Sequence, residues 1–178
     1  MILITGSKGL IGSNLVKSLK KKNKKIFKIN IREKNSPNSK KLNFRNKEIK
    51  KYIKKNSTLV HLAAVSNDVD GKKNPQFTFD VNINGTINLL ELAKIKKIKH
   101  FIFASTEWVY DKNNNDVNIE ADNVDITKMN SEYAISKIVC EQILKNYDKF
   151  FKITILRFGI IYSNRSHGGS AVESLVNK

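Results

Sequence analysis

Apolar and polar positions along this chain follow two patterns. Short apolar runs indicate buried strands, and the stretches between them repeat apolar residues at three- and four-residue spacing, as on one face of a helix. The predicted strands are Ile2–Thr5, Ile26–Ile31, Leu42–Phe44, Thr58–Ala63, His100–Ser105 and Lys152–Phe158. The predicted helices are about Leu10–Lys22, Lys47–Lys55, Phe77–Lys96 and Ser131–Asp148. Strands that alternate with helices indicate β-α-β units, and hence an α/β fold built on a parallel sheet.

Two stretches interrupt this alternation. Residues 34–41 are rich in Asn, Ser and Lys and contain Pro37, which predicts a surface loop. Residues 111–130 are polar and lack periodicity, and a connection of that length is usually functional or mobile. The chain of 178 residues shows no internal repeat, and its length suits one domain with its own core.

The composition adds a strong positive charge to this picture. A net charge of +17 first suggests nucleic acid or an anionic membrane as a partner. Nearly all of the basic residues are Lys, however, and Asn is also frequent, whereas recognition of phosphates and bases usually recruits Arg. We therefore interpret the charge as a solvated, lysine-rich surface and expect no nucleic-acid partner.

Cysteine use and hydropathy bear on the compartment. Cys140 is the only cysteine, which excludes an intrachain disulfide and a cysteine-based zinc site, and no metal site is expected. The chain opens on an apolar strand without a basic leader, and no apolar run approaches the roughly 18 residues of a membrane span. We therefore expect a cytoplasmic protein without a membrane partner.

A glycine-rich loop follows the first predicted strand and leads into the first helix. Its sequence is Gly6-Ser-Lys-Gly9-Leu-Ile-Gly12. Glycines suit this place because the turn is tight and the backbone must approach a pyrophosphate closely, while the helix N-terminus offers N–H donors to the phosphates. The loop therefore predicts a dinucleotide site in a Rossmann-type doubly wound sheet with helices on both faces.

The end of the second predicted strand bears on the choice of dinucleotide. Such folds usually place a carboxylate about 20 residues beyond the glycine loop, where it binds the adenosine ribose. This chain has Asn30 there, followed by Arg32. Asn can hydrogen-bond a free ribose, whereas Arg32 can pair with a 2′-phosphate that no carboxylate would repel. From these residues both NAD and NADP stay open.

The segment Tyr133-Ala-Ile-Ser-Lys137 is the most specific constellation of the sequence. The two residues are four apart at the start of a predicted helix, so the phenol and the ammonium lie on one face, one turn apart. Lowering the pKa of a phenol from about 10 to about 7 takes roughly 4 kcal/mol, which a neighbouring ammonium and an oxidised nicotinamide can supply. Tyr133 is therefore a candidate base and Lys137 its partner. Taken alone, a solvent-facing Tyr beside an unrelated Lys is the alternative.

Two further strand ends carry candidate ligand contacts. Ligands of open α/β sheets bind outside the carboxyl ends of the strands, so the hydroxyls of Ser105 and Thr106 are expected to face the cofactor crevice. The alternative for each is a hydroxyl that caps the strand end. The small residues Ala63 and Ala64 follow the fourth predicted strand, where a backbone has to pass close to a ligand. His61 is expected to be structural because no partner in the sequence would make it a base or a ligand.

Together these residues resemble the extended short-chain dehydrogenase/reductase family, in particular its NAD-dependent epimerase/dehydratase group, which acts on nucleotide sugars. The resemblance runs from Met1 to about Ser163. It implies that Thr106 is the catalytic hydroxyl, Tyr133 the base and Lys137 its partner. It also implies that the cofactor contacts are Gly6, Gly9, Leu10, Ile11, Gly12, Asn30, Arg32, Asn43, Phe44, Leu62, Ala63, Ala64, Asn82, Ser105, Tyr133 and Lys137.

The resemblance also implies a reaction. Tyr133 would remove a hydroxyl proton while hydride passes from a sugar carbon to the nicotinamide, and Lys137 would hold the nicotinamide ribose. Dehydratases of the group carry an Asp-Glu pair directly after the Thr, where this chain has Glu107 and Trp108, so 4,6-dehydration is disfavoured. Epimerases often carry Asn where this chain has Ile160, so a 4-epimerase is not favoured either. A reductase, or an epimerase of an unusual substrate, stays open.

Family members are longer than this chain and build their substrate lobe from the C-terminal part. The resemblance therefore implies a cofactor-binding domain over residues 1–163 and the start of an incomplete substrate lobe over residues 164–178. It implies a nucleotide-sugar substrate, NAD slightly ahead of NADP, and a homodimer that pairs through helices 77–96 and 131–148. The alternative from another class is a non-catalytic NAD(P)-binding or sensing module.

Overall fold

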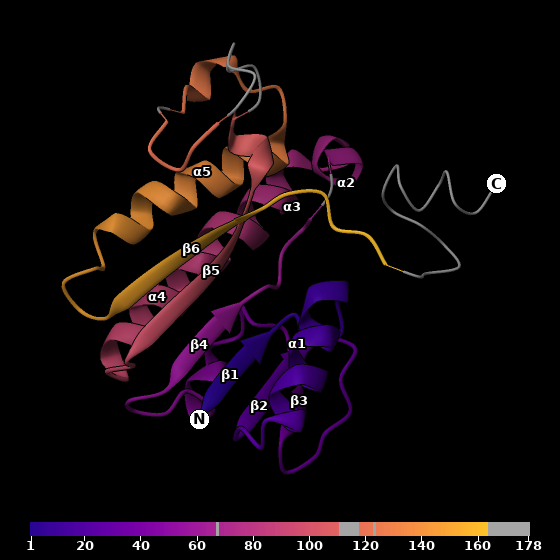
Figure 1. The fold of residues 1–178 in the computed structure, drawn as a ribbon, viewed down its shortest axis with the longest axis vertical. Coiled ribbons are helices and arrows are strands. Elements are labelled where there is room, and N and C mark those ends of the chain that lie inside the picture. Colours follow the sequence, from indigo (N-terminus) through magenta and orange to yellow (C-terminus); the bar gives the residue numbers. More distant parts are fainter. Residues whose placement is uncertain (67, 111–117, 123, 164–178) are drawn as a thin grey trace.

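The computed structural model describes residues 1–66, 68–110, 118–122 and 124–163 (Figure 1). The predicted start of a substrate lobe, residues 164–178, lies outside the described residues. Six parallel strands form one sheet in the order β3-β2-β1-β4-β5-β6. Their bounds are β1 Ile2–Thr5, β2 Ile26–Asn30, β3 Ser39–Lys41, β4 Thr58–His61, β5 His100–Thr106 and β6 Lys152–Phe158.

The helices connect these strands. The α-helices are α1 Leu10–Lys21, α2 Asp68–Lys73, α3 Pro75–Phe79, α4 Gly85–Ile95 and α5 Glu132–Lys145. Three 3₁₀ turns, η1 Lys47–Lys51, η3 Glu107–Tyr110 and η4 Ile126–Lys128, and one π-helical turn, η2 Asp80–Asn84, complete the described elements.

The order of the strands confirms the predicted doubly wound Rossmann-type sheet. From β1 the chain moves outward through α1 to β2 and β3, and it then crosses back to β4 and continues the other way to β5 and β6 (Figure 1). Crossovers between parallel strands are right-handed, so the two directions place α1 and α4 on opposite faces of the sheet. The reversal between β1 and β4 is the switch point at which such folds bind ligands.

The main core lies between the sheet and the helices α4 and α5. Successive strand residues point to opposite faces, and Leu3, Leu59 and Phe101 pack in this core with Leu89 of α4 and Leu144 of α5. A second, smaller cluster joins the start of α5 to the turns around it. The first cluster packs β4 and β5 against α4 and α5, and the second packs the turn that follows β5 against the first turns of α5.

Several predictions about local structure need correction. The third strand is Ser39–Lys41, and the residues predicted for it, Leu42–Phe44, form the following loop. The predicted helix Phe77–Lys96 is divided into α3, the π-helical turn and α4. The short helix α2 was not predicted, because its sequence is polar and contains Gly71. The predicted helix Lys47–Lys55 is a 3₁₀ turn over Lys47–Lys51, and the predicted surface loop 34–41 ends in β3. The remaining predicted strands and helices occur within a few residues of their expected bounds.

Candidate functional site

The glycine loop packs tightly against the end of β4. Gly6 has a φ of 74°, and a Cβ on it would lie 2.7 Å from the backbone nitrogen of Ala63. A Cβ on Gly12 would lie 2.2 Å from the carbonyl oxygen of Gly6. Gly9 is the N-cap of α1, so the first N–H groups of that helix, beginning at Leu10, lack intrahelical acceptors. The loop therefore has the close approach and the free donors that suit an anion such as a pyrophosphate.

A pocket of about 520 Å³ lies beside this loop, at the carboxyl ends of the central strands. Its volume falls within the range of roughly 300–1,000 Å³ that is usual for small-molecule and cofactor sites. The predicted cofactor residues that line it are Gly6, Gly9, Asn30, Arg32, Asn43, Phe44, Leu62, Ala63 and Ala64. The predicted contacts Leu10, Ile11 and Gly12 follow in the first turn of α1. Separate segments of the chain thus meet at one hollow, and the residues present fit a dinucleotide.

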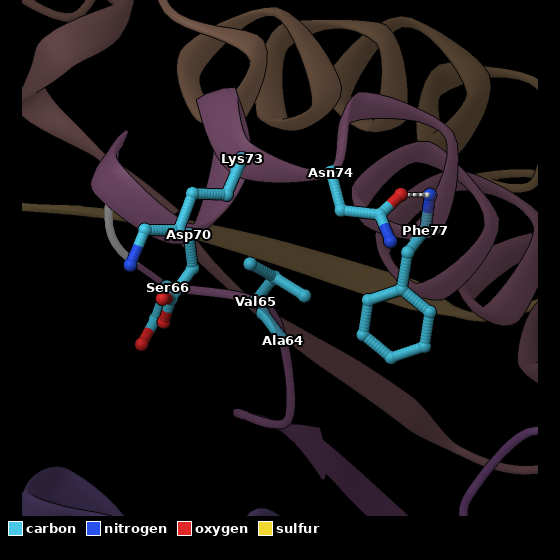
Figure 2. Close-up of a pocket in the computed structure, with 7 residues that line it drawn as sticks. All are labelled: Ala64, Val65, Ser66, Asp70, Lys73, Asn74 and Phe77. Atoms are coloured by element: carbon cyan, nitrogen blue, oxygen red, sulfur yellow. Dashed lines mark hydrogen bonds between the residues drawn. The ribbon is translucent and has the colours of Figure 1, made fainter.

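A second hollow of about 410 Å³ adjoins the first (Figure 2). The two share Ala64, Val65, Ser66 and Phe77 in their walls. Asp70, Lys73 and Asn74 complete the second hollow, and none of these three was predicted from the sequence. Figure 2 shows the side chain of Asn74 capping α3, where its Oδ1 accepts a hydrogen bond from the N–H of Phe77 at 3.0 Å. Asn followed by Pro is a helix-start signal, so the start of α3 could have been predicted from the sequence.

The side chains at the end of β2 are held by local contacts. Oδ1 of Asn30 accepts a hydrogen bond from the backbone N–H of Arg32 at 2.8 Å. The next residue, Glu33, is buried and was not predicted from the sequence. Its carboxylate accepts a hydrogen bond from the hydroxyl of Ser7 in the glycine loop at 3.0 Å and forms an ion pair with Lys28 at 3.5 Å. Glu33 therefore ties the loop to β2.

Asn82, predicted as a cofactor contact, joins the loop after β4 to α5. Its Oδ1 accepts from the N–H of Val65 at 2.9 Å, and its Nδ2 donates to the carbonyl oxygen of Val65 at 3.0 Å. Nδ2 also donates to the hydroxyl of Ser136 on α5 at 2.9 Å. Asn82 lies in the π-helical turn, and its carbonyl oxygen accepts hydrogen bonds from the hydroxyl of Thr86 and the thiol of Cys140. The side chain is buried and supports the pocket wall, and a direct cofactor contact stays a prediction.

The three predicted catalytic residues meet at the carboxyl end of β5. Thr106 ends β5, and its hydroxyl accepts a hydrogen bond from the N–H of Trp108 at 3.2 Å, which leaves its own proton to be donated. Tyr133 and Lys137 occupy successive turns of α5. Nζ of Lys137 donates to the carbonyl oxygen of Ala104 at 2.8 Å and lies 5.8 Å from the centroid of the Tyr133 ring.

Burial governs the protonation of these groups. It raises the pKa of Tyr133 above its ordinary value, and the hydrogen bond with Thr106 acts in the opposite direction. Burial also lowers the pKa of Lys137 to about 8, although the nearby Cys140 and Glu141 act to raise it. The expected lowering of the phenol pKa by Lys137 is therefore not found in this arrangement, in which the ammonium is bound to a backbone carbonyl.

Ser105, another predicted cofactor contact, belongs to a buried network between β5, α5 and β6. Its hydroxyl donates to the carboxylate of Glu141 on α5. That carboxylate also pairs with the guanidinium of Arg157 on β6 at 2.7 Å, and Arg157 donates to the hydroxyl of Tyr110. These residues were missed because they are far apart in sequence. The hydroxyl of Ser105 is thus already bonded within the protein, and its contact with a cofactor stays a prediction.

His61 has the structural role that the sequence predicted. It is buried at the end of β4, its Nδ1 lies 2.7 Å from the hydroxyl oxygen of Thr5, and its Nε2 lies 3.2 Å from that of Thr86. Burial, together with the positive charge of Lys137, lowers the pKa of His61 to about 3. The imidazole is therefore neutral and holds β1, β4 and α4 together.

Metal ions and membranes are the remaining classes of partner to consider. Residues 1–66, 68–110, 118–122 and 124–163 contain no group of three or more His, Cys, Asp or Glu side chains that could hold a metal ion. Within the same ranges, no helix combines the length and the apolar character needed to cross a membrane.

A Rossmann-type sheet with a glycine loop at its switch point, and with a Thr, a Tyr and a Lys at the end of its fifth strand, is the arrangement of the extended short-chain dehydrogenase/reductase class. Comparison with known proteins gives the same assignment. The model of the NAD dependent epimerase/dehydratase family matches residues 2–178, and the chain belongs to that family.

Individual relatives agree with this assignment. A dTDP-D-glucose 4,6-dehydratase of Dictyostelium discoideum is 33% identical over 99% of this chain and 47% of its own length. The UDP-N-acetylglucosamine 4-epimerase of Methanobrevibacter ruminantium M1, solved with UDP-N-acetylmuramic acid, superposes with a TM-score of 0.78 at 27% identity, over 88% of this chain and 53% of that one. The UDP-glucose 4-epimerase of Thermus thermophilus, solved with NAD, gives 0.75 at 25% identity, over 94% and 58%. The chain spans about half the length of the curated relatives it matches.

Proposed function

We propose that this chain forms the cofactor-binding and catalytic part of an NAD(P)-dependent enzyme that acts on a nucleotide sugar. The observation that carries the proposal is the convergence of Thr106, Tyr133 and Lys137 at the end of β5, in a fold whose switch point holds a dinucleotide-sized pocket. The relatives named above, which act on or bind nucleotide sugars by their names, support this class of substrate.

The chain's own groups have distinct roles in the proposed reaction. Tyr133 takes the proton of a sugar hydroxyl, and Thr106, whose hydroxyl accepts from the N–H of Trp108 and so can donate its own proton, hydrogen-bonds the same oxygen. The nicotinamide, when bound, supplies the acceptor for the hydride that leaves the sugar carbon. Lys137, whose Nζ donates to the carbonyl oxygen of Ala104, would hold the nicotinamide ribose, and its charge would favour the phenolate form of Tyr133.

The residues after Thr106 favour a redox or epimerisation reaction over dehydration. Dehydration needs a group that donates a proton to the leaving hydroxyl and a group that removes a proton from carbon. Trp108 occupies one of the two places where dehydratases of the family carry carboxylic residues, and an indole N–H cannot exchange protons in this way. Glu107 alone leaves the pair incomplete.

Cofactor binding and turnover test different parts of this proposal. We expect the purified chain to bind a reduced nicotinamide dinucleotide saturably, as followed by cofactor fluorescence, and Gly9→Asp to abolish binding because it sets a carboxylate at the phosphate site. In an assay of UDP- and dTDP-sugars with oxidised cofactor, Tyr133→Phe should lower turnover by orders of magnitude while binding is retained. The matched control is Tyr147→Phe, which removes a hydroxyl bonded to Glu91 beyond the other end of α5. Equal turnover of Tyr133→Phe and the wild type would refute the assignment of the base.

A non-catalytic NAD(P)-binding module is the second candidate, favoured by the observation that the chain spans about half the length of its relatives. It predicts the same cofactor binding and the same effect of Gly9→Asp. It predicts no turnover of any nucleotide sugar, so the sugar assay of the wild-type chain separates the two candidates.

A further inference from the structure

The charges that line the cofactor pocket are all positive. Arg32 and Arg45 belong to its wall, and the wall contains no Asp or Glu among the described residues. In dinucleotide folds a carboxylate near the end of the second strand binds the ribose hydroxyls of NAD, whereas an Arg nearby accommodates the 2′-phosphate of NADP. The solved relative that holds NAD shows which cofactor that protein binds, and this chain differs from the NAD pattern at the ribose end of its pocket.

The two nearby carboxylates are engaged elsewhere. Glu33 is only 5% exposed, and its oxygens are bound to Ser7 and Lys28. Asp80 forms an ion pair with Arg45, whose guanidinium also lies over the ring of Phe77. Neither carboxylate lines the pocket, so neither is placed to accept hydrogen bonds from a ribose there, and each is paired with a cation.

Arg32 and Asn30 then present donors to this end of the pocket. The side chain of Arg32 is exposed and has no hydrogen bond or ion pair with another side chain among the described residues, whereas Arg45 is neutralised by Asp80. Oδ1 of Asn30 is occupied by the backbone N–H of Arg32, which leaves its amide NH₂ for a ligand. A guanidinium and an amide donor suit a phosphate dianion, which accepts hydrogen bonds and donates none.

We propose that this pocket selects the dinucleotide that carries a phosphate on its adenosine ribose, NADP(H), with Arg32 as the residue that pairs with the phosphate and Asn30 as a second donor. This inference rests on the proposed function, because it names the cofactor of the same site.

The test is a fluorescence titration of the purified chain with NADPH and NADH at low salt. We expect NADPH to bind at least about tenfold more tightly, since a charge-assisted pair contributes roughly ten- to a hundredfold in affinity. Arg32→Ala should lose most of this preference by weakening NADPH alone. Relative to the wild type, Asn30→Asp should weaken the binding of NADPH and strengthen the binding of NADH, because a carboxylate repels the phosphate and binds ribose hydroxyls.

Lys34→Ala is the matched control, since it removes one exposed positive charge two residues away that does not line the pocket. It should keep the preference for NADPH. Equal or tighter binding of NADH by the wild type would overturn this inference and leave the proposed function standing. An equal loss for both cofactors in Arg32→Ala would also overturn it, because Arg32 would then act on the shared part of the ligand. Failure to bind either cofactor would overturn the proposed function as well.

Discussion

Acid should destabilise this protein through His61. The imidazole is only 2% exposed, is bonded to the hydroxyls of Thr5 and Thr86, and is surrounded by the rings of Phe44 and Phe103 at 4.9 and 6.0 Å. Because burial lowers its pKa from 6.5 to about 3, the unfolded chain binds a proton on this residue in a pH range in which the folded protein does not. The stabilisation is therefore present above pH 6.5 and is lost as the pH falls toward 3.

The magnitude follows from the two pKa values. Between pH 7 and pH 4.5 the folded imidazole stays neutral while the unfolded one becomes protonated, which lowers the free energy of unfolding by roughly 2–3 kcal/mol. Such a loss is a large part of the roughly 5–15 kcal/mol that stabilise an ordinary domain.

Urea unfolding at the two pH values, followed by circular dichroism, measures this loss. Carboxylates also titrate in this range, so the relevant quantity is the difference between the wild type and His61→Gln, which keeps a polar side chain but does not titrate. We expect the variant to lose roughly 2–3 kcal/mol less than the wild type between pH 7 and pH 4.5. His100→Gln, at a less buried histidine whose pKa is also lowered by burial, should show a smaller difference. An identical pH dependence of the wild type and His61→Gln would refute the reasoning.

Two further predictions concern packing and buried charge. Gly12→Ala should lower the melting temperature and abolish cofactor binding, because its Cβ would lie 2.2 Å from a backbone oxygen. Gly71→Ala should be neutral or slightly stabilising, because its Cβ would meet its nearest atom at 3.5 Å. Equal melting temperatures for the two variants would contradict this prediction. Glu141→Gln should cost about 3 kcal/mol in urea unfolding, because it leaves the guanidinium of Arg157 without its anionic partner. A loss below about 1 kcal/mol would indicate that the pair behaves like an exposed one.

The strands that the sequence predicted well are those whose side chains are buried in the core, such as Leu3 in β1 and Phe101 in β5. The third strand was misplaced because Ser39–Lys41 is polar and lies at the edge of the sheet, where pairing with β2 needs no apolar pattern. Leu42 and Phe44 were predicted as part of the strand because apolar residues indicate burial. They are buried in the core, but they lie in the loop after β3.

In the candidate site, too, some features could be predicted from the sequence and others could not. The glycine loop and the Tyr133–Lys137 pair were predictable because their geometry depends on short spacings within one turn or one helix. The contact of Ser7 with Glu33 and that of Glu141 with Arg157 were not predictable, because each joins residues on different elements and no local pattern specifies the partner. Such contacts follow only from the order of the strands.

The side-chain amide of Asn82 makes the pair of backbone hydrogen bonds that a neighbouring strand would make. By accepting from the N–H of Val65 and donating to its carbonyl, it satisfies both backbone groups of one residue, as an opposed residue does in an antiparallel ladder. β4 ends at His61, so this side chain holds the shape of the backbone beyond the last hydrogen bond of the sheet. The conformational entropy of that segment is lost when the chain folds and not when a ligand arrives, so the wall shared by the two hollows is preorganised for binding.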